Sequence, residues 1–267
     1  DTLFGTNANS QTTKKTEMKK INKTMIFGLL MTAGFLWLAF FYRPVPWWQA
    51  DRSSAGIAPL PEAEKRAVVQ VYAARTYSWR GFFSVHSWIA VKPENAKQYT
   101  TYQVLGYRLY RSGHSVAVEQ DVPDRRWYGA EPQLIEELRG EKAARAIPRI
   151  QKLAAEYAYD DTYVLWPGPN SNTFISYIIR NVPELTVELP PHAIGRDWLY
   201  DGRIFALSES KSGWQFSLYG LLGLTVGLGE GVEFNVLGLD FGVDILRPAV
   251  KLPFVGRIGM SDRPLEG

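Results

Sequence analysis

The chain has 267 residues, a formal net charge of +3 and an aromatic content of 13%. Its basic residues are interleaved with acidic ones and form no stripe, which argues against a nucleic-acid-binding protein. It contains no cysteine and 3 histidines, which excludes disulfides, thiolate zinc sites and a cysteine nucleophile and argues against a histidine-rich metal cluster. We therefore expect no metal, no cofactor and no nucleic-acid partner.

Residues 25–42 form an uncharged, apolar segment. In helical geometry the segment reaches about 27 Å, close to the thickness of the hydrocarbon core of a bilayer. A cluster of lysines ends at Lys23, just before the segment, whereas only Arg43 and Arg52 follow it closely, so the positive-inside rule places the N-terminus in the cytoplasm. We expect one transmembrane helix at 25–42, with a cytoplasmic or leader segment at 1–24. A cleaved secretory signal is the alternative.

The main domain is therefore expected on the periplasmic side of a bacterial inner membrane. Residues 1–17 precede a lysine-rich stretch that begins at Met18, and we exclude them from the fold prediction. Residues 43–62 are rich in proline, serine, glycine and alanine and show no periodicity, which predicts a linker between membrane and domain.

Short runs rich in valine, tyrosine and tryptophan begin the folded core, which we expect over residues 63–200. Their polarity nearly alternates, and glycine, proline and asparagine separate them, as in the strands of an antiparallel sheet. We predict strands within residues 67–75, 83–93, 100–111 and 115–120.

Two consecutive helices are expected after these strands. Pro132 suits a first helical position and Gly140 a stop, which predicts a helix over residues 132–139, and a second helix is expected over residues 141–157. Apolar residues at helical spacing then predict a buried helix over residues 173–180, opened by an Asn-Ser-Asn turn.

A β-rich extension is expected over residues 201–267. The glycine-rich stretch 214–231 predicts a packed hairpin in preference to a second membrane span. Residues 239–245 alternate apolar residues with aspartate and glycine, the pattern of a strand, and place Asp240 and Asp244 on one face. The predicted fold class is α+β: an antiparallel sheet with helices, a C-terminal β region and one N-terminal transmembrane helix.

Two residues are candidates for chemistry, His86 in VHSWIAV and Ser171 in WPGPNSNTF. His86 lies inside a predicted strand and is either a buried structural histidine or a general base. Ser171 precedes a predicted helix and is either its N-cap or a nucleophile supported by the helix dipole and free N–H groups. In the catalytic interpretation His86 takes the proton of the Ser171 hydroxyl.

Several longer strings between about residues 48 and 257 carry a resemblance: ADRSSAG, VHSWIAVKP, PDRRWYGAEP, LWPGPNSNTF, ELPPHAIGRDW and RPAVKLPFVGRIG. The chain resembles a bacterial family of domains of unknown function numbered 3750, which implies an envelope protein but supplies no activity. More distantly, the order of HSWI, strand and helices, and NSNTF resembles circularly permuted papain-like proteins of the NlpC and PPPDE type.

That second resemblance implies a permuted papain-like core. It gives His86 the role of base, Gln103 on the following strand the role of orienting the imidazole, and Ser171 the place of the nucleophilic cysteine. A serine hydroxyl is far less acidic than a thiol, so serine serves only where a base and an oxyanion hole are already arranged. The resemblance leaves open both an active serine enzyme and an inactive binding module.

Other polar residues are candidates for binding. The asparagines beside the serine supply either an oxyanion hole or a helix cap. An arginine pair in a turn meets either lipid or glycan phosphate or a surface carboxylate. An Arg-Asp pair beside a tryptophan is more simply explained by fixing a loop. These candidates are Asn170, Asn172, Arg125, Arg126, Arg196 and Asp197.

Three functions remain open from the sequence. The first is a membrane-tethered serine hydrolase or acyltransferase acting on lipid, amide or peptidoglycan-peptide bonds. The second is a catalytically inactive papain-like module that binds an envelope lipid or peptide. The third is a structural or assembly subunit of a membrane complex. The expected partners are the membrane, through the anchor, and an envelope lipid or peptidoglycan.

Overall fold

The computed structural model describes residues 23–34, 36 and 43–261. The chain divides into two compact units, Asp1–Pro46 and Trp47–Gly267, and each unit is described by itself. Predictions that fall on other positions lie outside the described residues.

In the first unit, residues 23–34 are helical. Within the part of the chain that the structure describes, no helix combines the length and the apolar character needed to cross a membrane. The expected transmembrane segment 25–42 includes residues 35 and 37–42, which lie outside the described residues, so the membrane anchor stays a prediction.

The second unit contains a five-stranded antiparallel sheet with strand order β4-β3-β2-β1-β5. Its valine, isoleucine, tyrosine and tryptophan residues favour strands because branched and flat side chains fill a pleated surface. The sheet confirms the antiparallel sheet predicted from the sequence. Its strands are β1 (Val68–Arg75), β2 (Val85–Lys92), β3 (Thr100–Val104), β4 (Val116–Gln120) and β5 (Gln133–Arg139).

The predicted strand at 100–111 is too long. Strand β3 ends at Val104, and the chain continues as the 3-10 helix η2 (Gly106–Arg108) and the short helix α2 (Leu109–Ser112). The ring of Tyr163 lies where a side chain on Gly106 would project. A glycine is therefore required at this turn, and the alternating pattern alone did not reveal it.

The predicted helix over residues 132–139 is wrong, because this segment is strand β5. Strand β5 pairs with β1 along the edge of the sheet, with one register shift between Val71 and Tyr72. The pairing buries Leu138 in the core and lets Leu134 pack on the other face of the sheet. Sheet hydrogen bonds and burial on both faces outweigh a helix propensity that differs by only a few tenths of a kcal/mol per residue.

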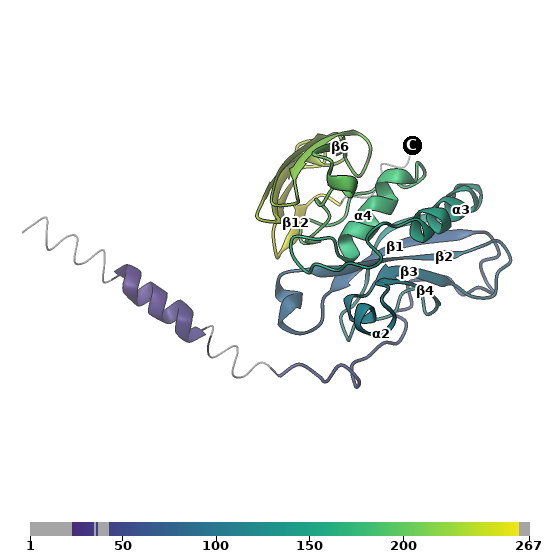
Figure 1. The fold of residues 1–267 in the computed structure, drawn as a ribbon, viewed down its shortest axis with the longest axis horizontal. Coiled ribbons are helices and arrows are strands. Elements are labelled where there is room, and N and C mark those ends of the chain that lie inside the picture. Colours follow the sequence, from purple (N-terminus) through teal and green to yellow (C-terminus); the bar gives the residue numbers. More distant parts are fainter. Residues whose placement is uncertain (1–22, 35, 37–42, 262–267) are drawn as a thin grey trace, which may run out of the picture. The chain divides into compact units, whose positions relative to one another are not determined.

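Two helices cover one face of this sheet, as Figure 1 shows. They are α3 (Glu141–Ala155) and α4 (Ser171–Asn181), and they confirm the helices predicted over 141–157 and 173–180. Apolar residues of both helices pack against alternate residues of the strands, which forms the main core. Its members include Val69, Val71, Ile89, Val91, Ala146, Ile150, Phe174, Ile175 and Ile178.

The opposite face of the sheet carries a smaller apolar cluster around Trp88, and part of the expected linker attaches to the loop that follows β4. The Asp124 carboxylate accepts hydrogen bonds from Ser54 Oγ (2.8 Å) and from the backbone N–H groups of Ile57 (2.6 Å) and Ala58 (3.1 Å). The middle of the segment 43–62 is therefore bound to the domain instead of running free of it.

A second, seven-stranded antiparallel sheet follows as a meander, with order β12-β11-β10-β9-β8-β7-β6. It contains the hairpin expected within 214–231 and the strand expected within 239–245. Figure 1 shows it as a separate layer beside α4. Its strands are β6 (Phe205–Leu207), β7 (Gly213–Leu218), β8 (Leu222–Gly227), β9 (Gly231–Val236), β10 (Leu239–Asp244), β11 (Ala249–Leu252) and β12 (Gly256–Gly259).

Two further 3-10 helices complete the unit, η1 (Ser78–Phe82) between β1 and β2 and η3 (Tyr200–Gly202) before β6. The described part of the chain is thus a mixed α+β structure with two antiparallel sheets and few helices.

Candidate functional site

The start of α4 is fixed by the side chain of Asn170. Its Oδ1 accepts hydrogen bonds from the backbone N–H groups of Asn172 (2.9 Å) and Thr173 (3.3 Å), and the Thr173 hydroxyl accepts one from the Asn170 N–H (3.1 Å). This is a capping box. The Asn170 amide donates to the carbonyls of Leu165 (3.1 Å) and Ile194 (3.0 Å). Of the two roles open from the sequence, the geometry supports the helix cap.

Asn172 ties α4 to strand β2. Its Oδ1 accepts from Ser87 Oγ (2.8 Å), and its amide nitrogen donates to the carbonyls of Val85 (3.0 Å) and Ile194 (2.8 Å). Both amide hydrogens are therefore engaged, and none is left to stabilise an oxyanion. This buried side chain is a structural link between two elements that are far apart in the sequence.

Ser171 is the first residue of α4 and is buried, but Asn170, and not Ser171, is the N-cap. The Ser171 hydroxyl forms no hydrogen bond with any residue that the structure describes. Among the described residues, this oxygen therefore lacks the general base within hydrogen-bonding reach that a serine nucleophile requires.

His86 is buried against aromatic rings. Its Nε2 donates to Gln103 Oε1 (3.0 Å), and its ring stacks on Trp127 with centroids 3.8 Å apart and planes 14° apart. Burial lowers the pKa of His86 to about 4, although the hydrogen bond with Gln103 acts in the opposite direction. The imidazole is thus neutral at pH 7, and the bond to Gln103 occupies Nε2.

The five-stranded sheet separates His86 from Ser171. Successive strand residues point to opposite faces. Ser87 bonds to Asn172 on the face that α4 covers, whereas the neighbouring His86 lies against Trp127 on the other face. The structure therefore brings His86 and Gln103 together but does not bring Ser171 to them.

The two arginines of the PDRRW turn are engaged with nearby groups. Arg125 pairs with Asp121 (2.5 Å), and Arg126 pairs with Glu131 (2.8 Å) and donates to the carbonyl of Ser54 (2.7 Å). These contacts correspond to the surface salt bridges that were one of the two interpretations of this turn. They also help to hold the segment before β1 on the domain.

Two hollows of the domain are relevant to the predicted catalytic residues. One of about 350 Å³ is lined by residues of α4 and η3, among them Tyr177, Arg180 and Tyr200, and its lining includes none of the three predicted catalytic residues. The other, of about 30 Å³, lies at Gln103 and Trp127 and has room for only one or two water molecules. Neither hollow unites the predicted catalytic residues at a cleft.

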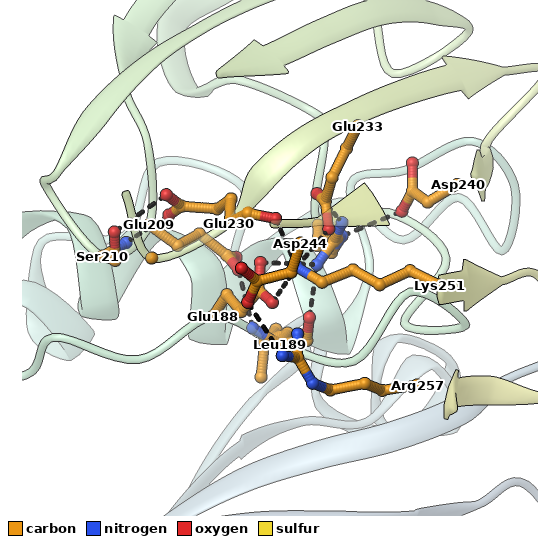
Figure 2. A network of polar contacts seen from close by, with 12 residues as sticks. Glu188, Leu189, Glu209, Ser210, Glu230, Glu233, Asp240, Asp244, Lys251 and Arg257 are labelled. Atoms are coloured by element: carbon orange, nitrogen blue, oxygen red, sulfur yellow. Dashed lines mark hydrogen bonds and ion pairs between the residues drawn. The ribbon is translucent and has the colours of Figure 1, made fainter. Parts of the chain in front are cut away.

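Arg196 belongs to a buried ion network beneath the second sheet. It donates from Nε to Asp240 Oδ2 (2.8 Å), pairs with Glu233 and donates to the carbonyl of Leu189. Lys251 pairs with the same Glu233 (2.7 Å), and Figure 2 shows the lysine approaching these carboxylates from β11. Arg196 thus fixes the second sheet to the loop after α4.

Asp197 takes part in the same network. Its carboxylate accepts hydrogen bonds from Gln215 and from the amide of Asn235 (3.0 Å), which also donates to Asp240 (2.8 Å). Both residues of the predicted Arg-Asp pair therefore serve to hold a loop and a sheet together.

The charges of this network depend on one another. Burial and the neighbouring Asp197 raise the pKa of Asp240 well above its usual value, despite Arg196. Burial also acts to raise the pKa of Glu233, but Arg196 and Lys251 outweigh it, so this pKa is lowered. Removing a cation would leave buried carboxylates without compensation.

The other predicted carboxylate of this strand face is also paired with arginines. Asp244, which shares a strand face with Asp240, pairs with Arg257 (2.8 Å) and Arg247 (3.4 Å). Among the described residues, no group of three or more histidine and acidic side chains is arranged to hold a metal ion.

The other face of the second sheet is apolar and exposed. Each of its central strands alternates a buried polar residue with an exposed apolar one, so the sheet is polar inside and apolar outside. We call this surface the outer sheet face. It comprises Phe205, Leu207, Trp214, Phe216, Leu218, Leu222, Leu224, Val226, Phe234, Val236, Phe241, Val243, Val250 and Ile258.

The sequence contained a signal for the two faces of this sheet. Every acidic or basic residue between positions 204 and 261 bonds within the domain, and in the strands the charged residues alternate with large apolar ones. The period of two predicted the strands, but it does not say which face is buried.

Residues 66–198 match a family model described as Protein of unknown function (DUF3750). This part of the chain is similar to the DUF3750 family. The match covers the five-stranded sheet, α3 and α4, and it ends before the second sheet begins at β6. No curated protein and no solved structure matches the chain. The DUF3750 description carries no activity, so function rests on the geometry.

Proposed function

We propose that the chain is a membrane-tethered envelope protein whose domain works by docking, through the outer sheet face, and not by catalysis. The tether is the uncharged segment 25–42, with lysines on its N-terminal side and a domain on the periplasmic side. Of the three functions open from the sequence, this proposal combines the two without catalysis, the inactive binding module and the structural subunit.

The outer sheet face is the observation that carries the proposal. About a dozen large side chains at roughly half exposure leave on the order of 1,000 Å² of apolar surface in water, against a few hundred Å² for the largest patch of a typical monomer. Covering even about 200 Å² of it is worth about 5 kcal/mol. A surface of this size is best explained by a partner that covers it.

The buried side of the sheet supports the same view. A sheet that faced water on its outer side would normally bury its apolar residues and expose its polar ones. Here the polar residues are buried, and ion pairs such as Arg196–Asp240 satisfy them. The sheet is held in this orientation by its own network, which leaves the apolar side for an external contact.

Catalysis has no comparable support. In the described part of the chain, no base lies beside the Ser171 hydroxyl, and His86 is neutral, stacked on Trp127 and bonded to Gln103. We keep the papain-like resemblance as part of the proposal in its inactive form, a module that binds without turnover. A fluorophosphonate probe that labels the native chain but not Ser171→Ala would contradict this view.

Single-cysteine labelling tests the proposal, because the chain has no cysteine of its own. Val226 on the outer sheet face and Val118 on β4 are 49% and 50% exposed, so they form a matched pair. In spheroplasts, a membrane-impermeant maleimide should label Val118→Cys and leave Val226→Cys unlabelled, and both should react after denaturation. Labelling of Val118→Cys only after lysis would contradict the periplasmic placement, and equal labelling of the two would contradict docking.

A further inference from the structure

The occupant of the outer sheet face is a lipid bilayer surface: we propose that this face lies on the outer side of the membrane that the chain is tethered to. This inference rests on the docking function proposed above and names its partner. Three features of the described residues carry it: the absence of charge on the face, the apolar turns at both ends of the sheet, and a strip of exposed aromatic residues beside it.

The outer sheet face has no exposed charge to offer a protein partner. The charged residues between positions 204 and 261 are turned into the domain or bonded along its edge, and they are Glu209, Lys211, Glu230, Glu233, Asp240, Asp244, Arg247, Lys251 and Arg257. A protein interface has an apolar centre and a polar rim that makes directional hydrogen bonds. Hydrocarbon needs no such rim.

The turns that end the strands are also apolar. At one end of the sheet, Leu228, Ile245 and Leu246 are exposed, with Ile245 at 77%, and at the other end Leu237 and Val255 are exposed. Turns that face water favour glycine, asparagine, aspartate and serine. In a sandwich of two copies these turns would lie at the perimeter and stay in water, whereas a bilayer surface would cover them.

One of these turns places a leucine where the backbone disfavours it. Leu237 and Gly238 form the β9–β10 turn with φ of 54° and 72°, a conformation that favours asparagine or glycine at the first position. A leucine there is strained because its Cβ lies too close to the backbone, and its side chain is 58% exposed. Burial of that side chain in an apolar phase would offset the cost.

A strip of aromatic residues continues from the sheet to η1. Phe254 in the β11–β12 turn contacts Phe83 (ring centroids 5.2 Å apart), and Phe83 contacts Trp79 of η1 (6.2 Å). The unit itself begins with the exposed pair Trp47 and Trp48. Tryptophan and tyrosine concentrate at membrane interfaces, where one end of the ring is apolar and the other is wet.

The length of the chain is compatible with this contact. Only residues 43–46 separate the expected transmembrane segment from the unit that begins at Trp47, and four residues span at most about 14 Å. A domain tethered this closely meets the membrane surface at a high effective concentration, so a modest intrinsic affinity suffices.

The experiment uses the full chain reconstituted in phosphatidylcholine vesicles, with a nitroxide label on single cysteines at Val226 and, in a second variant, at Val243 on β10. Val118→Cys is the control. Oxygen concentrates in hydrocarbon and a nickel chelate stays in water, so the accessibility of a label to each reagent shows which of the two surrounds it. We expect the ratio of oxygen to nickel accessibility to be at least about fivefold higher at 226 and 243 than at 118.

Any other result in vesicles overturns the inference that a bilayer covers the outer sheet face. The labelling in spheroplasts then shows whether the docking function is overturned as well. Spin–spin broadening at 226 with low access to both reagents would identify a second copy as the occupant. Nickel access at 226 equal to that at 118, together with protection of Val226→Cys in spheroplasts, would identify another protein. If the nickel chelate reaches position 226 in vesicles and Val226→Cys is not protected from the maleimide in spheroplasts, both proposals are overturned.

Discussion

Replacing Arg196 by alanine should destabilise the domain strongly. The Arg196 side chain is 3% exposed and is the cation nearest to both Asp240 and Glu233. Removing it leaves buried carboxylates without compensation, and breaking a buried ion pair in this way costs about 3–5 kcal/mol. For a domain of this size, we expect a loss of about 10 °C or more in Tm.

Urea unfolding of the full chain in detergent, followed by tryptophan fluorescence, measures this loss. The matched control is Arg149→Ala, because Arg149 pairs with Glu184 (2.8 Å) with its own side chain 48% exposed. The Glu184 side chain is only 8% exposed, but Arg145 also pairs with it (3.6 Å), so Glu184 keeps a cation when Arg149 is removed. Losing the half-exposed Arg149 should therefore cost about 0–1 kcal/mol. If Arg196→Ala loses no more stability than the control, the network does not hold the second sheet, and the reasoning fails.

The same variant has a pH dependence of defined sign. Without Arg196, the folded-state pKa of Asp240, which is already raised, rises further, and the pKa of Glu233, which Arg196 helps to lower, rises as well. Groups with raised folded-state pKa values contribute stability at low pH that is lost as pH rises. The stability difference between Arg196→Ala and the native chain should therefore be smaller at pH 5 than at pH 8. A difference that grows on acidification would contradict this assignment.

Three further predictions concern the residues that the sequence singled out. Ser171→Ala should change the free energy of unfolding by less than about 0.5 kcal/mol, because the hydroxyl has no described partner; a larger loss in urea unfolding would reveal a missed contact. Asn172→Ala should cost about 2–4 kcal/mol in the same assay, because it strands the hydrogen-bonding groups of Ser87 and Val85. In an NMR titration His86 should protonate near pH 4, so stability falls as pH drops from about 6.5 towards 4; a midpoint near 6.5 would contradict its burial.

The sequence predicted the elements whose patterns depend on local residues alone. Alternating valine and aromatic residues located β1 and β2, and helical spacing located α4. Strand β5 was missed because its order comes from pairing with β1, a partner about sixty positions earlier in the chain. The residues of a single segment do not reveal a pairing partner that is distant in the sequence.

The candidate site was harder to predict than the fold. The papain-like resemblance named Gln103 as the residue that orients His86, and the two side chains do form a hydrogen bond, while their catalytic roles stay a prediction. The sequence could not show that His86 points away from α4, because this depends on which face of β2 the helices cover. Likewise, the alternation in β8 and β10 fixed two faces but not which of them meets water.

The labelling ratio between Val226→Cys and Val118→Cys in spheroplasts tests the docking claim most directly, since the two side chains have the same exposure in the isolated domain. We predict that Val226→Cys reacts at less than about a tenth of the rate of Val118→Cys, and that mild detergent removes the difference by displacing the occupant. Equal rates before detergent would mean that the outer sheet face is open to water in the envelope, which would contradict the account.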